Sequence, residues 1–372
     1  MKKHKDVDAF FALLRAGLWE QSVRLLPFEP IDFDTLYQLA NEQSVVGLVA
    51  AGLEHVEDRK VTKTEAVPFL KRVFSLESRN VSMNAFIEKK VLEMRQHGIY
   101  ALLVKGQGIA QCYERPLWRS SGDIDFFFDE INYAKAKSLF LPLADSFIKE
   151  GEFSKEQELT LDLWTVELHG TLRCGLSRKM DKVIDTIQDE TFRKGQVRAW
   201  RNGHTDVFLP DQNNDVIFVF THCLKHFYKG GIGLRQICDW CRLLWIYRDR
   251  IDRGVLESRL MQMRLMSEWK AFAAFAVDYL GMMAETMPLY DSNPRWSRKA
   301  SLIRSFILEV GNFGHNRDMS YYHKYPYLVR KAVSFGRRCG DLSRHSLIFP
   351  LDSLRFFPSI VFHGIRSVAR WE

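Results

Sequence analysis

The sequence lacks any apolar run long enough to cross a bilayer, so no transmembrane segment is expected. The closest stretch, Leu347–Ile365, is interrupted by Asp352, by Arg355 and by two prolines. The N-terminus is basic, but it runs into Asp6 and Asp8 instead of an apolar signal core. Together these absences predict a cytoplasmic protein.

Cysteine is scarce, with six among 372 residues, and the spacing has no disulfide-framework rhythm. This usage fits a reducing compartment. Cys238 and Cys241 have the spacing of a zinc or redox pair, but no second pair accompanies them. Both fall on the apolar stripe of an expected helix, so we interpret them as small buried hydrophobic side chains.

Acidic residues are few near the end of the chain. Arg295–Glu372 contains 14 Lys and Arg against 5 Asp and Glu, whereas the whole chain carries a net charge of +7. Such a region predicts an anionic partner, such as nucleic acid, a phosphorylated acceptor or an anionic lipid surface. A helical region with a solvated basic face explains the same composition. The sequence does not choose between these interpretations.

Hydrophobic and charged shares of 46% and 27% are those of a globular protein, and the length predicts two or three structural units. We expect an N-terminal helical region (1–97), an α/β core (98–210) and a C-terminal helical, basic region (211–372). The fold class is α+β, with a small mixed sheet and flanking helices.

Apolar spacing predicts the individual elements. The expected helices are Asp6–Leu14, Asp34 to Leu53, Pro68 to His97, Tyr133–Phe140, Asn214–Phe227 and Leu234–Trp245. The expected strands are Ile99–Val104, the Asp123 strand, Phe147-Ile148, Leu159–His169 as one continuous strand, and Val207–Leu209.

Leu102–Phe128 is the stretch around which the chain is organised. It reads as a strand ending in Lys105-Gly106, a short helix, a basic turn and a second strand with Asp123 and Asp125. Side chains alternate along a strand, so the two carboxylates project from the same side. Two adjacent carboxylates repel unless a cation lies between them, and magnesium prefers oxygen ligands. The alternative is a solvated strand edge.

These residues carry a resemblance to a known family. The pattern resembles the uncharacterised nucleotidyltransferase family of the polymerase-β-like superfamily at Lys105-Gly106, Tyr113, Pro116, Arg119, Gly122-Asp123-Ile124-Asp125 and the Glu167-x-His169 element. The similarity extends over Asp34–Glu54 and His222–Asp239, and so covers most of the chain up to about residue 250. One departure is Gly106-Gln107, where many relatives have Gly-Ser or Gly-Gly.

The resemblance implies a nucleotidyltransferase that uses magnesium and a nucleoside triphosphate such as ATP. It assigns the catalytic and metal-binding roles to Asp123, Asp125 and Glu167, which would hold two Mg²⁺ ions. Nucleotide contacts are expected from Lys105, Gly106, Arg119, Ser121 and Gly122, with Ser120 as a further donor or turn cap. The acceptor could be a small molecule, a sugar, a protein hydroxyl or a tRNA end, and the basic C-terminal region favours an anionic one.

A second group of residues is expected to position the substrate, namely His169, His222, His226, Arg235 and Asp239. His222 and His226 lie four residues apart, a spacing that also suits zinc, but the glutamate of a metalloprotease helix is lacking. Asp239 could instead pair with Arg235 across one helical turn. The glycine-rich break Lys229–Arg235 is interpreted as an inter-helix turn in preference to a phosphate site.

Two other functions stay open from the sequence. One is a binding or toxin-neutralising module that keeps the nucleotidyltransferase-like fold without turnover. The other is an active toxin that nucleotidylates tRNA or protein.

Overall fold

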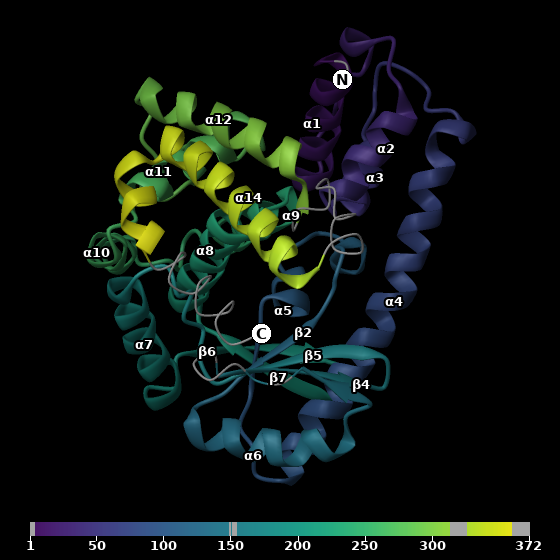
Figure 1. Ribbon diagram of the computed structural model, residues 1–372. Coiled ribbons are helices and arrows are strands. Elements are labelled where there is room, and N and C mark those ends of the chain that lie inside the picture. The colour runs from purple at the N-terminus through teal and green to yellow at the C-terminus, as the bar shows by residue number, and fades with distance from the viewer. Residues whose placement is uncertain (1–3, 149, 151–154, 313–325, 359–372) are drawn as a thin grey trace.

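A computed structural model gives the arrangement of the chain and describes residues 4–148, 150, 155–312 and 326–358 (Figure 1). The sheet lies in the lower half of the view, the N-terminal helices stand at the upper right, and the C-terminal helices cover the upper left. Parts of the predicted basic region, 313–325 and 359–372, lie outside the described residues.

The main sheet has five strands in the order β1-β2-β5-β4-β3. Only β2 and β5 run parallel, and the other neighbours are antiparallel. The strands are β1 (Leu102–Val104), β2 (Ile124–Phe127), β3 (Ser146–Phe147), β4 (Glu156–Leu161) and β5 (Trp164–His169). A separate antiparallel hairpin, β6 (Val197–Asn202) and β7 (Thr205–Pro210), packs beside β1. The predicted α+β class with a small mixed sheet is therefore confirmed.

Helices precede, interrupt and follow the sheet. The N-terminal group is α1 (His4–Trp19), α2 (Phe33–Glu42), α3 (Val46–Glu54) and α4 (Lys63–Gln96). Within the core lie α5 (Gly106–Ala110), α6 (Glu130–Phe140) and α7 (Arg178–Arg193), and short 3₁₀ turns are η1 (Leu26–Phe28), η2 (Pro116–Trp118) and η3 (Leu141–Leu143). The later group is α8 (Gln212–Lys229), α9 (Leu234–Ile246), α10 (Arg253–Met263), α11 (Met266–Asp278), α12 (Pro294–Val310) and α14 (Tyr327–Ile348).

Side-chain capping explains several helix starts. The Asp32 carboxylate accepts hydrogen bonds from the backbone of the first turn of α2, and Asp211 does the same for α8. Thr62 and Glu65 form a reciprocal capping box at the start of α4. The cap of α2 is thus Asp32, two residues before Asp34, where the helix was expected to start.

Alternation along the strands gives the sheet two different faces. Ile124 and Phe126 of β2 join an apolar cluster with α4 and α6. Asp125 and Phe127 project to the opposite face, where Phe127 joins the larger apolar cluster that includes α8. One polar residue within a buried strand therefore marks the face that carries the site.

Two predicted elements are wrong in their continuity. The expected single strand Leu159–His169 is a hairpin, because Asp162 and Leu163 adopt φ of 48° and 72° and reverse the chain between β4 and β5. The expected helix from Asp34 to Leu53 breaks near Ser44, which has φ of 56°, into α2 and α3. In addition, α7 and β6 were not predicted.

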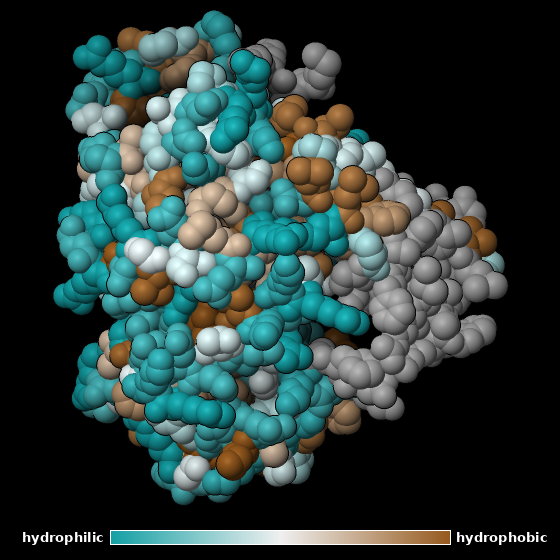
Figure 2. Space-filling model, turned by 90° about the vertical axis from the view of Figure 1, so that its left-hand side faces the viewer, coloured by the Kyte–Doolittle hydropathy of each residue, from teal (hydrophilic) through white to brown (hydrophobic). Residues whose placement is uncertain are grey.

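The larger apolar cluster runs through several regions of the chain. It joins Phe10 of α1, Val104 of β1, Phe220 of α8 and Trp269 of α11. On the face seen in Figure 2, hydrophobic residues lie in separate groups among hydrophilic ones. Within the part of the chain that the structure describes, no helix combines the length and apolar character needed to cross a lipid bilayer.

Candidate active site

A sharp backbone turn at the end of β1 places the first site residue. Lys105 has φ of 56° and Gly106 has φ of 37°, both in the region that side chains disfavour. A Cβ on Gly106 would make only an ordinary contact, 3.6 Å from the Asp123 carbonyl oxygen, so the conformation is what favours glycine there. The turn directs the Lys105 ammonium to Asp125, with Nζ 2.6 Å from Oδ1.

The parallel pairing of β2 with β5 brings the third carboxylate to the first two. Asp125 stands opposite Glu167 in the register, as the predicted three-carboxylate group required. Asp123 lies two residues earlier and faces the same cavity as Asp125 and Glu167. The hairpin at Asp162-Leu163 is what reverses the chain so that β5 can run parallel to β2.

The three carboxylates have different electrostatic surroundings. Burial alone would raise the pKa of Asp125, but the Lys105 charge and a hydrogen bond with His169 hold it well below its usual range. The pKa of Asp123 is raised, first by the charge of Asp125 and then by burial. Burial also raises the pKa of Glu167. The surroundings of Asp123 and Glu167 therefore shift their pKa values in the opposite direction to that of Asp125.

His169 lies between two of these carboxylates. Its Nε2 is 2.8 Å from Asp125 Oδ1 and 3.1 Å from Glu167 Oε2. Burial and the nearby Lys105 charge lower the pKa of His169, but the two carboxylates outweigh them and raise it overall. His169 is thus a buried partner of the carboxylates, at the back of the site.

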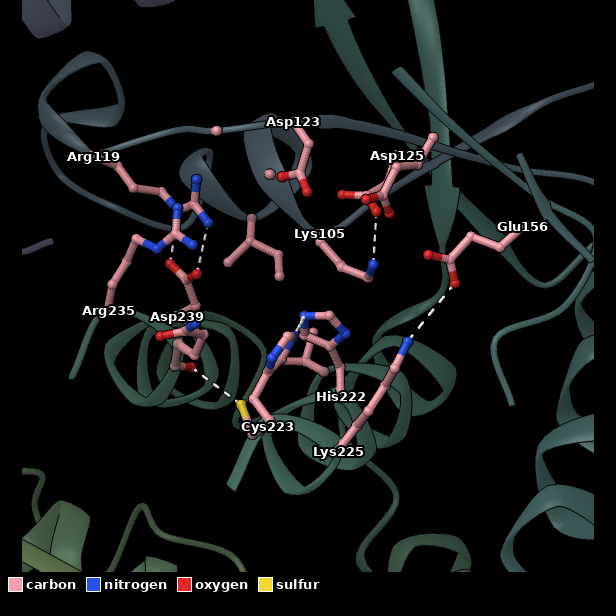
Figure 3. Close-up of a pocket in the computed structure, with 17 residues that line it drawn as sticks. Lys105, Arg119, Asp123, Asp125, Glu156, His222, Cys223, Lys225, Arg235 and Asp239 are labelled. Carbon is pink, nitrogen blue, oxygen red and sulfur yellow. Dashed lines mark hydrogen bonds and ion pairs between the residues drawn. The ribbon is translucent and has the colours of Figure 1, made fainter. Parts of the chain in front are cut away.

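The opposite wall comes from helices α8 and α9. In Figure 3, His222 extends from α8 toward Lys105 and Asp125, and Lys225 extends from the same helix toward Glu156. His222 Nε2 and His226 Nε2 are 3.0 Å apart. Burial lowers the pKa of both imidazoles, that of His226 to about 3, with further lowering by the neighbouring lysines. Both rings are therefore neutral at pH 7.

A buried ion pair closes one end of the cavity. Arg119 donates from Nε and Nη2 to the two carboxylate oxygens of Asp239, at 2.7 and 2.6 Å. The Tyr113 hydroxyl donates to Asp239 Oδ1 at 2.7 Å, and Arg235 Nη1 donates to the Ser120 carbonyl at 2.9 Å. Asp239 thus binds Arg119, the residue that follows η2, and the bidentate face of Arg119 is already occupied.

These walls enclose one cavity, which we call the inner cavity. Counting its open mouth, it contains about 840 Å³ of space. Its lining includes every predicted site residue except Ser120, Ser121 and His169, namely Lys105, Gly106, Arg119, Gly122, Asp123, Asp125, Glu167, His222, His226, Arg235 and Asp239. Ser121 instead donates to Asn80 Oδ1 at 2.5 Å, and His169 lies behind the carboxylates.

Sequence reasoning missed three polar residues of this lining. Glu156 comes from β4, Lys225 from α8 and Gln236 from α9. Lys225 Nζ is 3.7 Å from Glu156 Oε2, so this pair joins the sheet to the helices. The position of Lys225 between His222 and His226 on one helix was an available signal for it. Glu156 offered no such signal, because it depends on the hairpin that was missed.

The unusual Gly106-Gln107 pair also has a structural explanation. Gln107 is buried, and its amide nitrogen donates to Asn80 Oδ1 at 2.9 Å. The Gln107 side chain therefore links α5 to α4 by a hydrogen bond and does not line the inner cavity.

The donor set fits a divalent cation. Asp125, Glu167 and His169 each offer one ligand atom, and these atoms lie within 4.8 Å of one another. Asp123 adds a carboxylate to the same cavity, and its raised pKa reports the repulsion from Asp125 that a cation would relieve. Carboxylate oxygens suit Mg²⁺, whereas participation of the imidazole would favour a transition metal.

The comparison with protein families gave one match for this chain. The model described as "Uncharacterised nucleotidyltransferase" matches residues 29–281, which is more than half of the sequence. The matched range begins before α2 and ends after α11, so it contains all residues of the inner cavity. No curated protein and no solved structure gave a match.

Proposed function

Because the chain belongs to the uncharacterised nucleotidyltransferase family, we propose that it transfers a nucleoside monophosphate from a nucleoside triphosphate to a hydroxyl-bearing acceptor, with Mg²⁺ as the metal. One observation carries this proposal. Asp125 and Glu167 stand in register on adjacent parallel strands, with Asp123 facing the same cavity. This arrangement gathers three oxygen ligands beside an open cavity that is also lined by lysine and arginine side chains.

In the proposed reaction Asp123, Asp125 and Glu167 are the metal ligands. Two bound Mg²⁺ ions would stabilise the charge that develops on the triphosphate and lower the pKa of the attacking hydroxyl. Lys105 keeps Asp125 ionised and contributes its own charge to the cavity. His169 orients Asp125 and Glu167 from behind through Nε2.

The remaining polar residues bind and position the nucleotide in this proposal. Gly106 leaves the backbone open next to Asp123, and Gly122 lies on the cavity wall. Arg119 acts mainly through its ion pair with Asp239, which closes one end of the inner cavity. Arg235, His222 and His226 face the same space, where neutral imidazoles can donate or accept hydrogen bonds.

One observation favours a second candidate function, nucleotide binding without turnover. Lys105 and His169 both contact Asp125 Oδ1, so Asp125 already has two cationic or polar partners. A protein of this kind would bind the triphosphate against Lys105 and release no pyrophosphate.

Thermal unfolding with each of the four nucleoside triphosphates separates these functions. Ligands that bind only the folded state raise the midpoint. We expect a magnesium-dependent rise for the wild type that Asp123→Ala loses, together with magnesium-dependent pyrophosphate release. A rise without pyrophosphate release supports the non-catalytic module, and no rise with any nucleotide contradicts both.

Two further statements stay proposals. We propose a cytoplasmic location, which the free state of the cysteines in the described residues supports. We also retain the division into 1–97, 98–210 and 211–372 as a proposal about organisation, with the apolar cluster that includes Phe10, Val104 and Trp269 joining the three regions.

A further inference from the structure

A second cavity adjoins the inner cavity on the side of the N-terminal helices, and we call it the outer cavity. Counting its mouth, it contains about 1090 Å³ of space. Its uncharged polar lining comes from widely separated parts of the chain: Asn41, Ser44, Ser120, Ser121, Thr165 and Asn312.

Two of the three predicted catalytic carboxylates lie at the boundary between the two cavities. Asp123 and Glu167 line both, whereas Lys105 and Asp125 line only the inner one. In nucleotidyl transfer the attacking and leaving oxygens lie roughly in line on opposite sides of the phosphorus. A nucleotide in the inner cavity therefore requires an acceptor that approaches the carboxylates from the other side, which is the outer cavity.

The two cavities offer different chemistry to a ligand. The inner cavity has four cationic side chains, Lys105, Arg119, Lys225 and Arg235, against five carboxylates, Asp123, Asp125, Glu156, Glu167 and Asp239. Its lysines and arginines suit a polyphosphate when the carboxylates are occupied by the proposed divalent cation. The outer cavity has Arg72 and Arg235 against Asp123, Glu158 and Glu167, so it has no cationic surplus for a polyanion. Hydroxyl and amide groups provide most of its other polar contacts.

Part of the outer lining is held in place by its own hydrogen bonds. Asn312 Nδ2 donates to Ser44 Oγ at 2.7 Å, and Gln236 Nε2 donates to Asn312 Oδ1 at 2.9 Å. Gln236 lines the inner cavity, so these two hydrogen bonds link the linings of the two cavities. Fixed amides and hydroxyls recognise a ligand that carries several hydroxyl groups at set positions.

We propose that the outer cavity binds the acceptor and that the acceptor is a small, uncharged polyhydroxyl compound of the sugar class. This inference rests on the proposed function. In the step, an acceptor hydroxyl oxygen bonds to the α-phosphorus as the bond from that phosphorus to the bridging oxygen breaks. Pyrophosphate leaves with the electron pair, and the hydroxyl proton passes to water.

Thr165 allows a specific test, because it is exposed, lines the outer cavity and does not line the inner one. Thr165→Tyr places a ring in the outer cavity. Thr186→Tyr makes the same change at an exposed position of α7, outside both linings, and serves as the matched control. The probes are hexoses, pentoses, inositol and disaccharides, observed by saturation-transfer NMR on the full chain.

We expect at least one sugar to bind the wild type and Thr186→Tyr, with a fivefold or greater loss of signal in Thr165→Tyr. The magnesium-dependent thermal shift with nucleotide should stay in all three proteins. With α-phosphate-labelled nucleotide, the bound sugar should become labelled as pyrophosphate is released.

Three results would overturn the inference. They are no binding of any sugar, equal binding by Thr165→Tyr, and label transferred to added RNA or protein while sugars stay unlabelled. Absence of any nucleotide shift is a different failure, because it contradicts the proposed function. Sugar binding in that case would exclude the acceptor role and leave only a sugar-binding site.

Discussion

Asp125 in the sheet and Glu268 in α11 are both buried carboxyl groups, but their surroundings shift their pKa values in opposite directions. Their exposed fractions are 2% and 0%. Asp125 has Lys105 Nζ at 2.6 Å and His169 Nε2 at 2.8 Å, and its pKa is held well below the usual range. Glu268 Oε1 has the Tyr228 hydroxyl at 3.3 Å and Arg355 Nη2 at 4.0 Å, and burial raises the pKa of Glu268 to about 8.

The two residues separate the effect of burial on a carboxyl pKa from the effect of a paired cation. Burial favours the neutral form of both carboxyl groups, so the difference between them comes from the cations placed against Asp125. Lys105 is placed by a strained turn at the end of β1, and His169 by the strand that also carries Glu167. The strained backbone at Lys105 directs a positive charge to Asp125. The Glu268 carboxyl lies within α11, and Arg355 Nη2 lies 4.0 Å from it.

The largest expected difference between the two carboxyls is in activity. Asp125→Asn should lower magnesium-dependent pyrophosphate release by about 10³-fold or more, because one metal ligand loses its charge. Glu268→Gln makes the same acid-to-amide change outside the inner cavity and should alter the rate by less than about twofold. Equal losses in both variants would show that the effect comes from folding, which far-ultraviolet circular dichroism would check.

Removing the cation from Asp125 should make its surroundings resemble those of Glu268. Lys105→Met leaves a buried carboxylate without its 2.6 Å partner, and breaking such a pair costs about 3 kcal/mol of unfolding free energy. Urea unfolding at pH 7 with a metal chelator present would measure the loss. Lys225→Met is the control, because its ion pair with Glu156 is longer, at 3.7 Å, and about a third exposed, so less than about 1 kcal/mol is expected. Similar losses in both variants would contradict the special role of Lys105.

The sequence predicted much of this site because its signals are local. Asp123 and Asp125 alternate with apolar residues in one strand, and this pattern alone indicates one polar face in a buried element. The stripe of α8 likewise places His222 and His226 together. The family resemblance added Glu167 and the α9 residues, and the matched family is the one predicted.

What the sequence did not reveal depends on long-range pairing or on rare backbone conformations. Asp162 and Leu163 adopt positive φ without glycine, so the β4–β5 hairpin lacks the Asn-Gly or Asp-Gly pair that usually marks such a turn. Arg119 was predicted to reach the triphosphate, but Asp239, 120 residues later, binds its bidentate face. The outer cavity could not be predicted either, because Ser44, Thr165 and Asn312 meet only in the folded chain.

The Glu268 carboxyl predicts a pH dependence of stability. Its pKa rises from an ordinary 4.5 to about 8 on folding, so the folded state binds the extra proton between these pH values and stability falls as pH rises through them. The groups that face it are Tyr228, Asp352, Arg355 and Lys299. Glu268→Gln should therefore gain stability over the wild type between pH 5 and pH 8.5, by roughly 4 kcal/mol. Urea midpoints across this range test it, and a constant difference between the two proteins would contradict it.

The smallest expected effect concerns the turn at Asp162-Leu163, which brings Glu167 opposite Asp125. Glu268 lies within helix α11, and its position depends on no such turn. Leu163 has φ of 72° and is 93% exposed, so its side chain adds strain without burial. Leu163→Gly should raise the unfolding free energy by about 0.5–1 kcal/mol and leave nucleotide binding unchanged, because glycine adopts this conformation without a steric penalty. Leu143→Gly, at a 55% exposed leucine outside the positive-φ group, should lower stability by increasing the entropy of the unfolded chain. If thermal unfolding shows a gain in stability for Leu163→Gly and a loss for Leu143→Gly, backbone conformation and not exposure decides the outcome. A loss of stability in both variants would mean that the Leu163 side chain makes a stabilising contact in this turn.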